Sequence, residues 1–225
     1  MKFIQSGRFF ARAMVAGAWV ACGATGGERV EALIFYSSGS MTFNTTAPTG
    51  DLAGSGWQLQ GRWGSFLATP VAPNWFLAAK HVGGSVGQAL VLNGTNYVTV
   101  QQVNHPTADL TLWKVSTTTR FPAYAPLYTA ANEAGKPLVV FGRSATRGAD
   151  VNVAGTSPSP LRGWAWGGPG AGTIRWGQNV VEGTTTIGGA QYLYASFDRS
   201  GGSNEATLAS GDSSGAVLDR KSTRL

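Results

Sequence analysis

From residue 56 onward, the sequence is a succession of short apolar or alternating runs separated by turn residues. The clearest pair spans 89–92 and 97–103 and flanks Asn93-Gly94, a dipeptide that favours the tight primed turn of a β-hairpin. Charged residues make up only 12% of the chain and glycine supplies 32 residues, which disfavours a helical bundle or a coiled coil. The pattern therefore predicts an all-β barrel or sandwich.

The first 32 residues are typical of a secretory signal peptide. Lys2, Arg8 and Arg12 form a basic region, and the apolar stretch at 13–24 that follows is too short to span a bilayer. We expect cleavage after residue 32, with cleavage after Ala24 as the second choice. A buried N-terminal helix is the alternative to a signal peptide. After cleavage, the mature protein would be secreted, periplasmic or on the cell surface. It would contain no disulfide, because the single cysteine, Cys22, lies in this segment.

The last seven residues, 219–225, resemble one reading frame of a short-read sequencing adapter. We expect the native sequence to stop near Leu218 in a truncated gene, with a natural polar tail as the alternative. The net charge of +6 also belongs mainly to the ends, because residues 33–218 hold 10 Lys or Arg against 8 Asp or Glu. The remaining excess of +2 gives no support to nucleic-acid binding.

The body of the chain divides into two β halves of comparable length. A stretch at 116–136 is rich in Thr, Pro and Ala, and its part at 121–136 is the predicted linker that separates residues 54–120 from residues 137–218. Residues 33–53 form a separate N-terminal segment. The glycine-rich stretch at 163–172 predicts a mobile loop.

Three segments carry residues suited to nucleophilic catalysis. His81 follows an apolar run, Asp109 begins another, and Ser213 lies in Gly211-Asp-Ser-Ser-Gly215. A serine hydroxyl needs an imidazole to accept its proton and a carboxylate to orient that imidazole. The chain supplies one candidate for each role, although a packed histidine, a strand start and an ordinary turn would also explain them.

The mature body contains few residues that could bind a metal ion or a cofactor. His81 and His105 are its only histidines, and it has no cysteine once the signal peptide is removed. A zinc site of the usual Cys/His type is therefore poorly supplied, and no phosphate-binding glycine loop is present. We expect neither a cofactor nor a bound metal.

Taken in order, the three catalytic segments resemble those of the trypsin-like (chymotrypsin-fold) serine peptidases, and the resemblance runs from about residue 54 to 218. It implies a double six-stranded β-barrel whose second barrel is incomplete. It also implies a monomeric serine endopeptidase that hydrolyses polypeptides through an acyl-enzyme. His81 would be the base, Asp109 the orienting carboxylate and Ser213 the nucleophile. The backbone N–H groups of Gly211 and Ser213 would form the oxyanion hole.

The resemblance has departures. Lys80 replaces a small residue before the histidine, Ser214 replaces a glycine after the nucleophile, and Ala216 replaces a proline. Thr207, six residues before the nucleophile, would form the floor of the specificity pocket, which argues against a strict preference for Lys or Arg. Because family members continue well beyond the nucleophile, we expect this chain by itself to be unstable or inactive.

Two other function classes stay open. The nucleophile segment also fits the G-x-S-x-G elbow of an α/β-hydrolase-type esterase, but the triad histidine of that class follows the serine and none does here. A non-catalytic secreted β module, either an inactive peptidase homologue or a carbohydrate-binding domain, is the second. Trp164, Trp166 and Trp176 would then offer a stacking surface for sugars.

Overall fold

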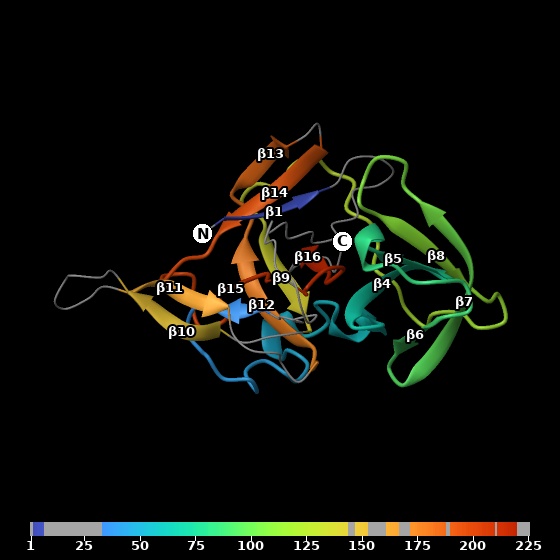
Figure 1. The fold of residues 1–225 in the computed structure, drawn as a ribbon, viewed down its shortest axis with the longest axis horizontal. Coiled ribbons are helices and arrows are strands. Elements are labelled where there is room, and N and C mark those ends of the chain that lie inside the picture. Colours follow the sequence, from blue (N-terminus) through green and yellow to red (C-terminus); the bar gives the residue numbers. More distant parts are fainter. Residues whose placement is uncertain are drawn as a thin grey trace, which may run out of the picture.

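The computed structural model describes residues 2–6, 33–143, 147–152, 161–166, 172–187, 190–209 and 211–219. It consists almost entirely of β-strands, arranged as two halves that lie side by side (Figure 1). The helical elements of these ranges are three short 3-10 turns, at Gly50–Leu52 (η1), Trp57–Leu59 (η2) and Lys80–Val82 (η3). The predicted all-β class is confirmed.

Six strands close the first half into a barrel. They are β3 (Gly61–Trp63), β4 (Phe66–Ala72), β5 (Trp75–Ala78), β6 (Ala89–Leu92), β7 (Thr95–Asn104) and β8 (Thr111–Val115). The order around the barrel is β3-β4-β5-β8-β7-β6, and β6 pairs back to β3 where Arg62 faces Val91. Because the sheet closes on itself, this half has no free sheet edge.

Alternation along the strands fills the barrel with aromatic side chains. In β8, Thr111, Trp113 and Val115 are buried, whereas Leu112 between them is exposed. Trp63 packs against Phe76 and Trp113, with ring centroids 5.1 and 5.0 Å apart. These contacts hold β3, β5 and β8 together around one apolar core.

The predicted hairpin is β6 and β7. Asn93 and Gly94 connect the two strands with φ values of 50° and 79°. A type I′ turn needs positive φ at both central residues, which is why the Asn-Gly dipeptide predicted the turn correctly.

The second half contains several smaller sheets. Its strands are β1 (Lys2–Ser6), β2 (Ile34–Phe35), β9 (Pro137–Gly142), β10 (Arg147–Asn152), β11 (Leu161–Trp166), β12 (Arg175–Val180), β13 (Gly183–Ile187), β14 (Ala190–Ser196), β15 (Ala206–Thr207) and β16 (Val217–Asp219). They pair as β12-β9-β16, β1-β14-β13, β15-β2 and β10-β11. Among the described residues they form no second closed barrel, so the predicted incomplete second barrel is confirmed.

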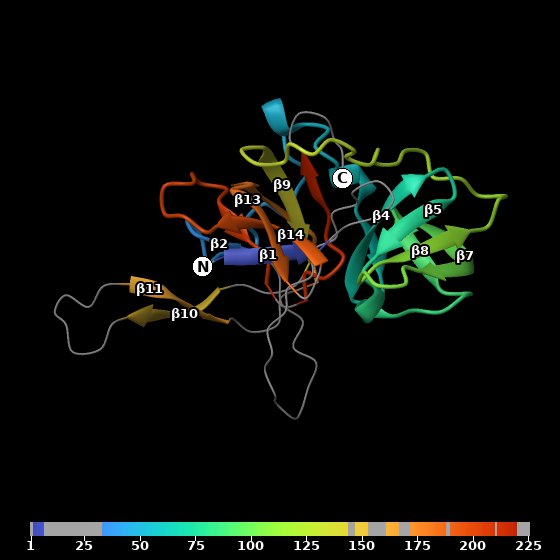
Figure 2. The same cartoon turned by 90° about the horizontal axis from the view of Figure 1, so that it is seen from above.

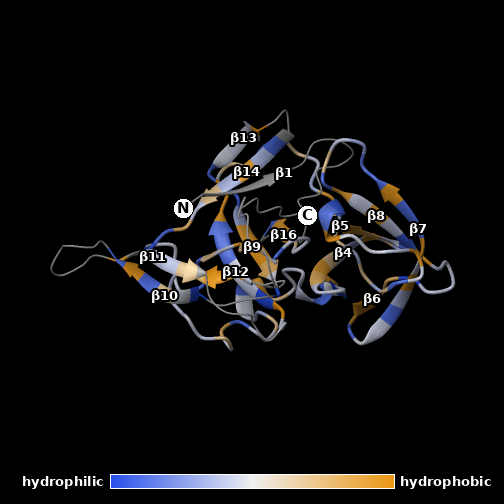
Figure 3. Ribbon diagram, viewed as in Figure 1, coloured by the Kyte–Doolittle hydropathy of each residue, from blue (hydrophilic) through white to orange (hydrophobic). Residues whose placement is uncertain are grey.

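A shared apolar cluster joins the two halves. Leu59 and Leu67 from the first half pack with Val139 and Phe141 of β9 and Leu218 of β16, and all five are buried. Figure 3 shows the corresponding apolar segments on β4, β9 and β16. This cluster fixes β9 and β16 against the barrel, and the turn that precedes β16 carries Ser213.

One expectation was wrong. The segment at 163–172 was expected to be a mobile loop, but residues 163–166 belong to β11, which pairs with β10 and extends away from the barrel (Figure 2). Residues 167–171 lie outside the described residues. The guanidinium of Arg147 lies over the ring of Trp164 at 4.4 Å, and Tyr36 contacts the same ring edge-on at 5.1 Å. These contacts order the strand despite its glycine.

The structure describes only part of the predicted signal peptide and of the last seven residues. The predicted signal peptide contains β1, which pairs with β14, while residues 7–32, including Cys22, lie outside the described residues. At the other end, β16 ends at Asp219, and residues 220–225 lie outside them as well. No helix within the described ranges is long and apolar enough to cross a membrane.

Candidate active site

The end of β5 carries His81 from the barrel core to the surface. Phe76, Ala78 and Ala79 are buried at the end of this strand, and the chain then turns through η3. The side chain of His81 is 45% exposed. The imidazole therefore lies in a short turn directly after a buried strand and is partly exposed to solvent.

Asp109 lies just before β8 and contacts η3 at three points. Its backbone O accepts a hydrogen bond from Lys80 N at 3.3 Å, and its Oδ1 accepts one from His81 N at 2.9 Å. Its Oδ2 lies 2.5 Å from His81 Nδ1. The pairing of Ala78 with Thr111 places the two segments side by side, so the sheet register produces the His–Asp contact.

The environment of Asp109 keeps its carboxyl group ionised. Partial burial raises its pKa, but hydrogen bonds from the ring and backbone of His81, the charge of His81 and the backbone of Lys80 outweigh this effect. The net result is a pKa below the ordinary value. An ionised Asp109 accepts a hydrogen bond from Nδ1–H, which leaves Nε2 of His81 as the nitrogen that can accept a proton.

Ser213 reaches this acceptor from the second half. Its Oγ lies 2.7 Å from His81 Nε2. The serine sits in a turn closed by a hydrogen bond from Gly215 N to Asp212 O at 2.9 Å. The structure thus brings His81, Asp109 and Ser213 together in one hydrogen-bonded row.

The turn is anchored by close packing on β9. The buried carboxylate of Asp212 accepts hydrogen bonds from Arg143 N and Ala209 N, both at 3.0 Å. At Gly215, an added Cβ would lie 2.0 Å from the backbone O of Phe141. Only glycine allows this approach, so the position of Ser213 depends on its neighbours in the turn.

Two backbone donors beside Ser213 are unoccupied. Gly211 has a φ of 90°, in the region that favours glycine. Within the described part of the chain, the N–H groups of Gly211 and Ser213 make no hydrogen bond. Both donors are therefore available to an oxygen atom placed next to the serine.

Comparisons with known proteins give similarity at the level of the fold. No protein-family model matches the sequence, and no curated protein matches it. Among solved structures, an inactive form of Rv3671c from M. tuberculosis has 16% identity and a TM-score of 0.45 over 74% of this chain and 70% of that one.

Two further solved structures match this chain. Neuropsin, a serine protease expressed in the limbic system of mouse brain, has 14% identity and a TM-score of 0.46, covering 73% of this chain and 78% of that one. The MamO protease domain from Magnetospirillum magneticum has 16% identity and a TM-score of 0.38, covering 68% and 69%. In this chain the closed barrel is the first half, and the sheets of the second half do not close among the described residues.

Two other residues considered from the sequence lie outside the hydrogen-bonded row. Thr207, in β15, is 1% exposed and pairs with Ile34. His105 Nδ1 accepts hydrogen bonds from Thr107 N at 3.2 Å and Ala108 N at 2.8 Å, which shapes the turn before Asp109. His105 therefore supports the site through the backbone.

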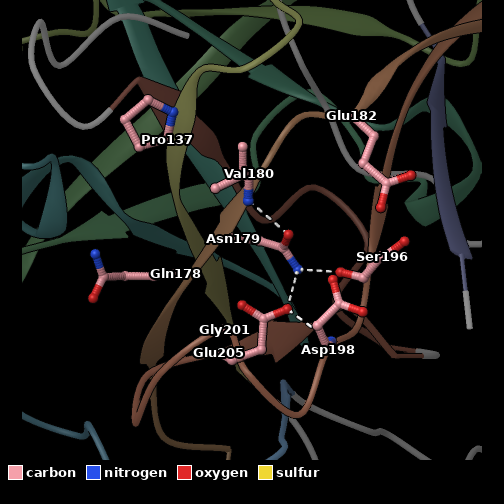
Figure 4. Close-up of a pocket in the computed structure, with 9 residues that line it drawn as sticks. All are labelled: Pro137, Gln178, Asn179, Val180, Glu182, Ser196, Asp198, Gly201 and Glu205. Carbon is pink, nitrogen blue, oxygen red and sulfur yellow. Dashed lines mark hydrogen bonds between the residues drawn. The ribbon is translucent and has the colours of Figure 1, made fainter.

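The described residues contain no group of three or more His, Cys, Asp or Glu that could hold a metal ion. Two cavities lie elsewhere in the second half, and neither is lined by the hydrogen-bonded row. One has a volume of about 410 Å³ and includes Arg147 and Trp164. The other, of about 280 Å³, contains Glu205, whose carboxylate accepts a hydrogen bond from Asn179 (Figure 4).

Proposed function

We propose that this protein is a serine endopeptidase in which Ser213 is the nucleophile, His81 the general base and acid, and Asp109 the orienting carboxylate. One observation carries the proposal: His81 bonds Asp109 through Nδ1 at 2.5 Å and Ser213 through Nε2 at 2.7 Å. This arrangement points the basic nitrogen of the imidazole at the Ser213 hydroxyl, which needs a proton acceptor to become a good nucleophile.

Acylation begins when Ser213 Oγ attacks the carbonyl carbon of a peptide bond and its proton passes to His81 Nε2. Asp109 stabilises the imidazolium that forms. The tetrahedral intermediate collapses, the C–N bond breaks, and the leaving amine takes the proton from Nε2. The product is an ester between the substrate and Ser213.

Deacylation repeats the steps with water. His81 Nε2 removes a proton from a water molecule as the water attacks the ester carbonyl. The second tetrahedral intermediate expels Ser213 Oγ, which takes the proton back from Nε2. The serine and the imidazole return to their starting states.

The free N–H groups of Gly211 and Ser213 support a role as the oxyanion hole. Negative charge develops on the carbonyl oxygen in both tetrahedral intermediates. Donors already aimed at that oxygen stabilise it, and loss of one such donor typically reduces kcat by about 10²–10³.

We propose a polypeptide substrate and an exported protein, following the signal-like N-terminus. Thr207 is proposed as the floor of the specificity pocket. A threonine there carries no charge to pair with a basic side chain, so the preference would not be restricted to Lys or Arg.

A fluorophosphonate active-site probe tests the proposal on the full chain. Because His81, Asp109 and Ser213 form their hydrogen-bonded row within this chain, we expect the chain to react, in place of the inactivity expected from the sequence. The wild-type protein should be labelled covalently at Ser213, and Ser213→Ala should abolish labelling. Ser55→Ala is the matched control, because Ser55 is 2% exposed and its Oγ has no partner among the described residues. It should label at the wild-type rate.

Two results would contradict the proposal. Labelling that survives Ser213→Ala would place the reactive group elsewhere. A folded wild-type protein that is not labelled would favour the non-catalytic β module. An α/β-hydrolase has no support here, since the strand pairs of the described sheets are antiparallel.

A further inference from the structure

Ser214 occupies an unusual backbone position beside the proposed nucleophile. Its φ is 66°, one of three positive values found at non-glycine residues in the described part of the chain. It is the third residue of the turn at 212–215, where a left-handed conformation favours glycine. A serine here carries a conformational cost that a glycine would avoid.

The side chain of Ser214 offers a compensating contact. Its Oγ accepts a hydrogen bond from the backbone N–H of Ala79 at 2.6 Å. Both residues are buried, Ser214 at 2% exposure and Ala79 at 1%. A buried N–H that lost this acceptor would be left unsatisfied, so the bond matters to the local structure.

This contact joins the two segments that carry the reacting groups. Ala79 lies two residues before His81, at the point where β5 passes into η3. Ser214 directly follows Ser213. The Ser214–Ala79 bond therefore runs beside the Ser213–His81 bond and ties the same two pieces of backbone, one from each half of the molecule.

We propose that Ser214 is a positioning residue, which fixes the distance between Ser213 Oγ and His81 Nε2 by holding the nucleophile turn to the backbone of Ala79. The proposal rests on the proposed function of Ser213 and His81. A glycine at this position would relax the backbone but would remove the tie between the two halves.

Two substitutions separate positioning from stability. Ser214→Gly removes the hydroxyl and relaxes the left-handed backbone, whereas Ser214→Ala removes the hydroxyl and keeps the strain. Ser214→Gly should therefore have the higher Tm of the two. Both variants should react with the fluorophosphonate probe about ten- to a hundredfold more slowly than the wild type, since small displacements of reacting groups lower rates by such factors.

A residue that only stabilised the fold would give another result. The labelling rate would then follow the Tm, and the relaxed Ser214→Gly variant would label at the wild-type rate. That outcome would overturn the proposal. Ser55→Ala, which removes another buried hydroxyl, should leave the labelling rate unchanged and so controls for the loss of a buried hydroxyl away from the site.

Two NMR measurements test the hydrogen bond between Ser214 and Ala79 independently of activity. Exchange of the Ala79 amide should become at least about tenfold faster in both variants, while the Lys80 amide, bonded to Asp109 O, stays protected. The resonance of the His81 Nδ1 proton should shift or broaden. An unchanged Ala79 exchange rate or an unchanged His81 resonance would overturn the proposal. An unlabelled wild type would instead overturn the proposed function.

Discussion

His81 Nε2 lies 2.7 Å from Ser213 Oγ, although 132 residues separate them in the chain. His81 belongs to the closed barrel, and Ser213 belongs to the turn between the loop that follows β15 and strand β16. The contact therefore depends on the packing of the two halves and on the buried cluster between them. Each half alone holds only part of the proposed site.

The first prediction concerns Asp109. Asp109→Asn should preserve the packing of η3 but remove the charge that stabilises the imidazolium, and it should favour the wrong tautomer of His81. We expect the rate of probe labelling to fall by about 10³–10⁴. The Tm should stay close to the wild-type value.

The matched control for Asp109 is Asp150→Asn, on the exposed strand β10. It removes one carboxylate charge without touching the His81 row, so its labelling rate should stay at the wild-type value. An Asp109→Asn variant that labels like the Asp150→Asn protein would contradict the orienting role.

The second prediction concerns the packing of the nucleophile turn. In Gly215→Ala the new Cβ would meet Phe141 O at 2.0 Å, so the turn must move away from β9. We expect a loss of at least about 3 kcal/mol in the free energy of unfolding, measured in urea. Labelling of Ser213 should be lost as well.

Gly94→Ala is the comparison for this effect. Gly94 has a φ of 79° with nothing within 4 Å of an added Cβ, so alanine there meets backbone strain alone. It should cost about 1–2 kcal/mol and leave labelling unchanged. Equal losses in the two variants would show that the clash with Phe141 is relieved easily.

The third prediction compares two buried tryptophans of the barrel. Trp63 Nε1 donates to Gly83 O at 3.0 Å, whereas Trp113 Nε1 has no partner within the described residues. Replacement by phenylalanine removes a similar volume at each site. Because only Trp63→Phe breaks a hydrogen bond, it should be less stable than Trp113→Phe by about 1–3 kcal/mol. Equal free energies of unfolding would contradict this.

Much of the site was predictable because its signals are local. Asn93-Gly94 specifies a hairpin through its own backbone preferences, and the segments around His81, Asp109 and Ser213 each carry a short recognisable pattern. The His81–Asp109 contact then follows from strand pairing, as Ala78 and Thr111 show, whereas Ser213 joins them through the packing of the two halves.

Other features depend on contacts that no local pattern encodes. The sequence marked Ser214 only as a departure from a family pattern, because its partner is a backbone N–H at Ala79, far away in the chain. The order of β11 depends likewise on Arg147 and Tyr36 around Trp164. In both cases the deciding partner comes from another element of the fold.

The fourth prediction concerns Glu205. Burial raises its pKa to about 7 from an ordinary 4.5, and the nearby charge of Asp198 adds to this against a hydrogen bond from the Asp198 backbone. Folding therefore favours the protonated form of Glu205. The contribution of this protonated carboxyl group to the free energy of unfolding is complete below about pH 4.5 and is lost as the pH rises through 7. Glu205→Gln cannot titrate, so it should become more stable than the wild type by about 1–2 kcal/mol between pH 5 and 8 in urea unfolding.

Glu182→Gln, in the same cavity, controls for lost negative charge. Parallel pH profiles for Glu205→Gln and the wild type would show that Glu205 is not the titrating group.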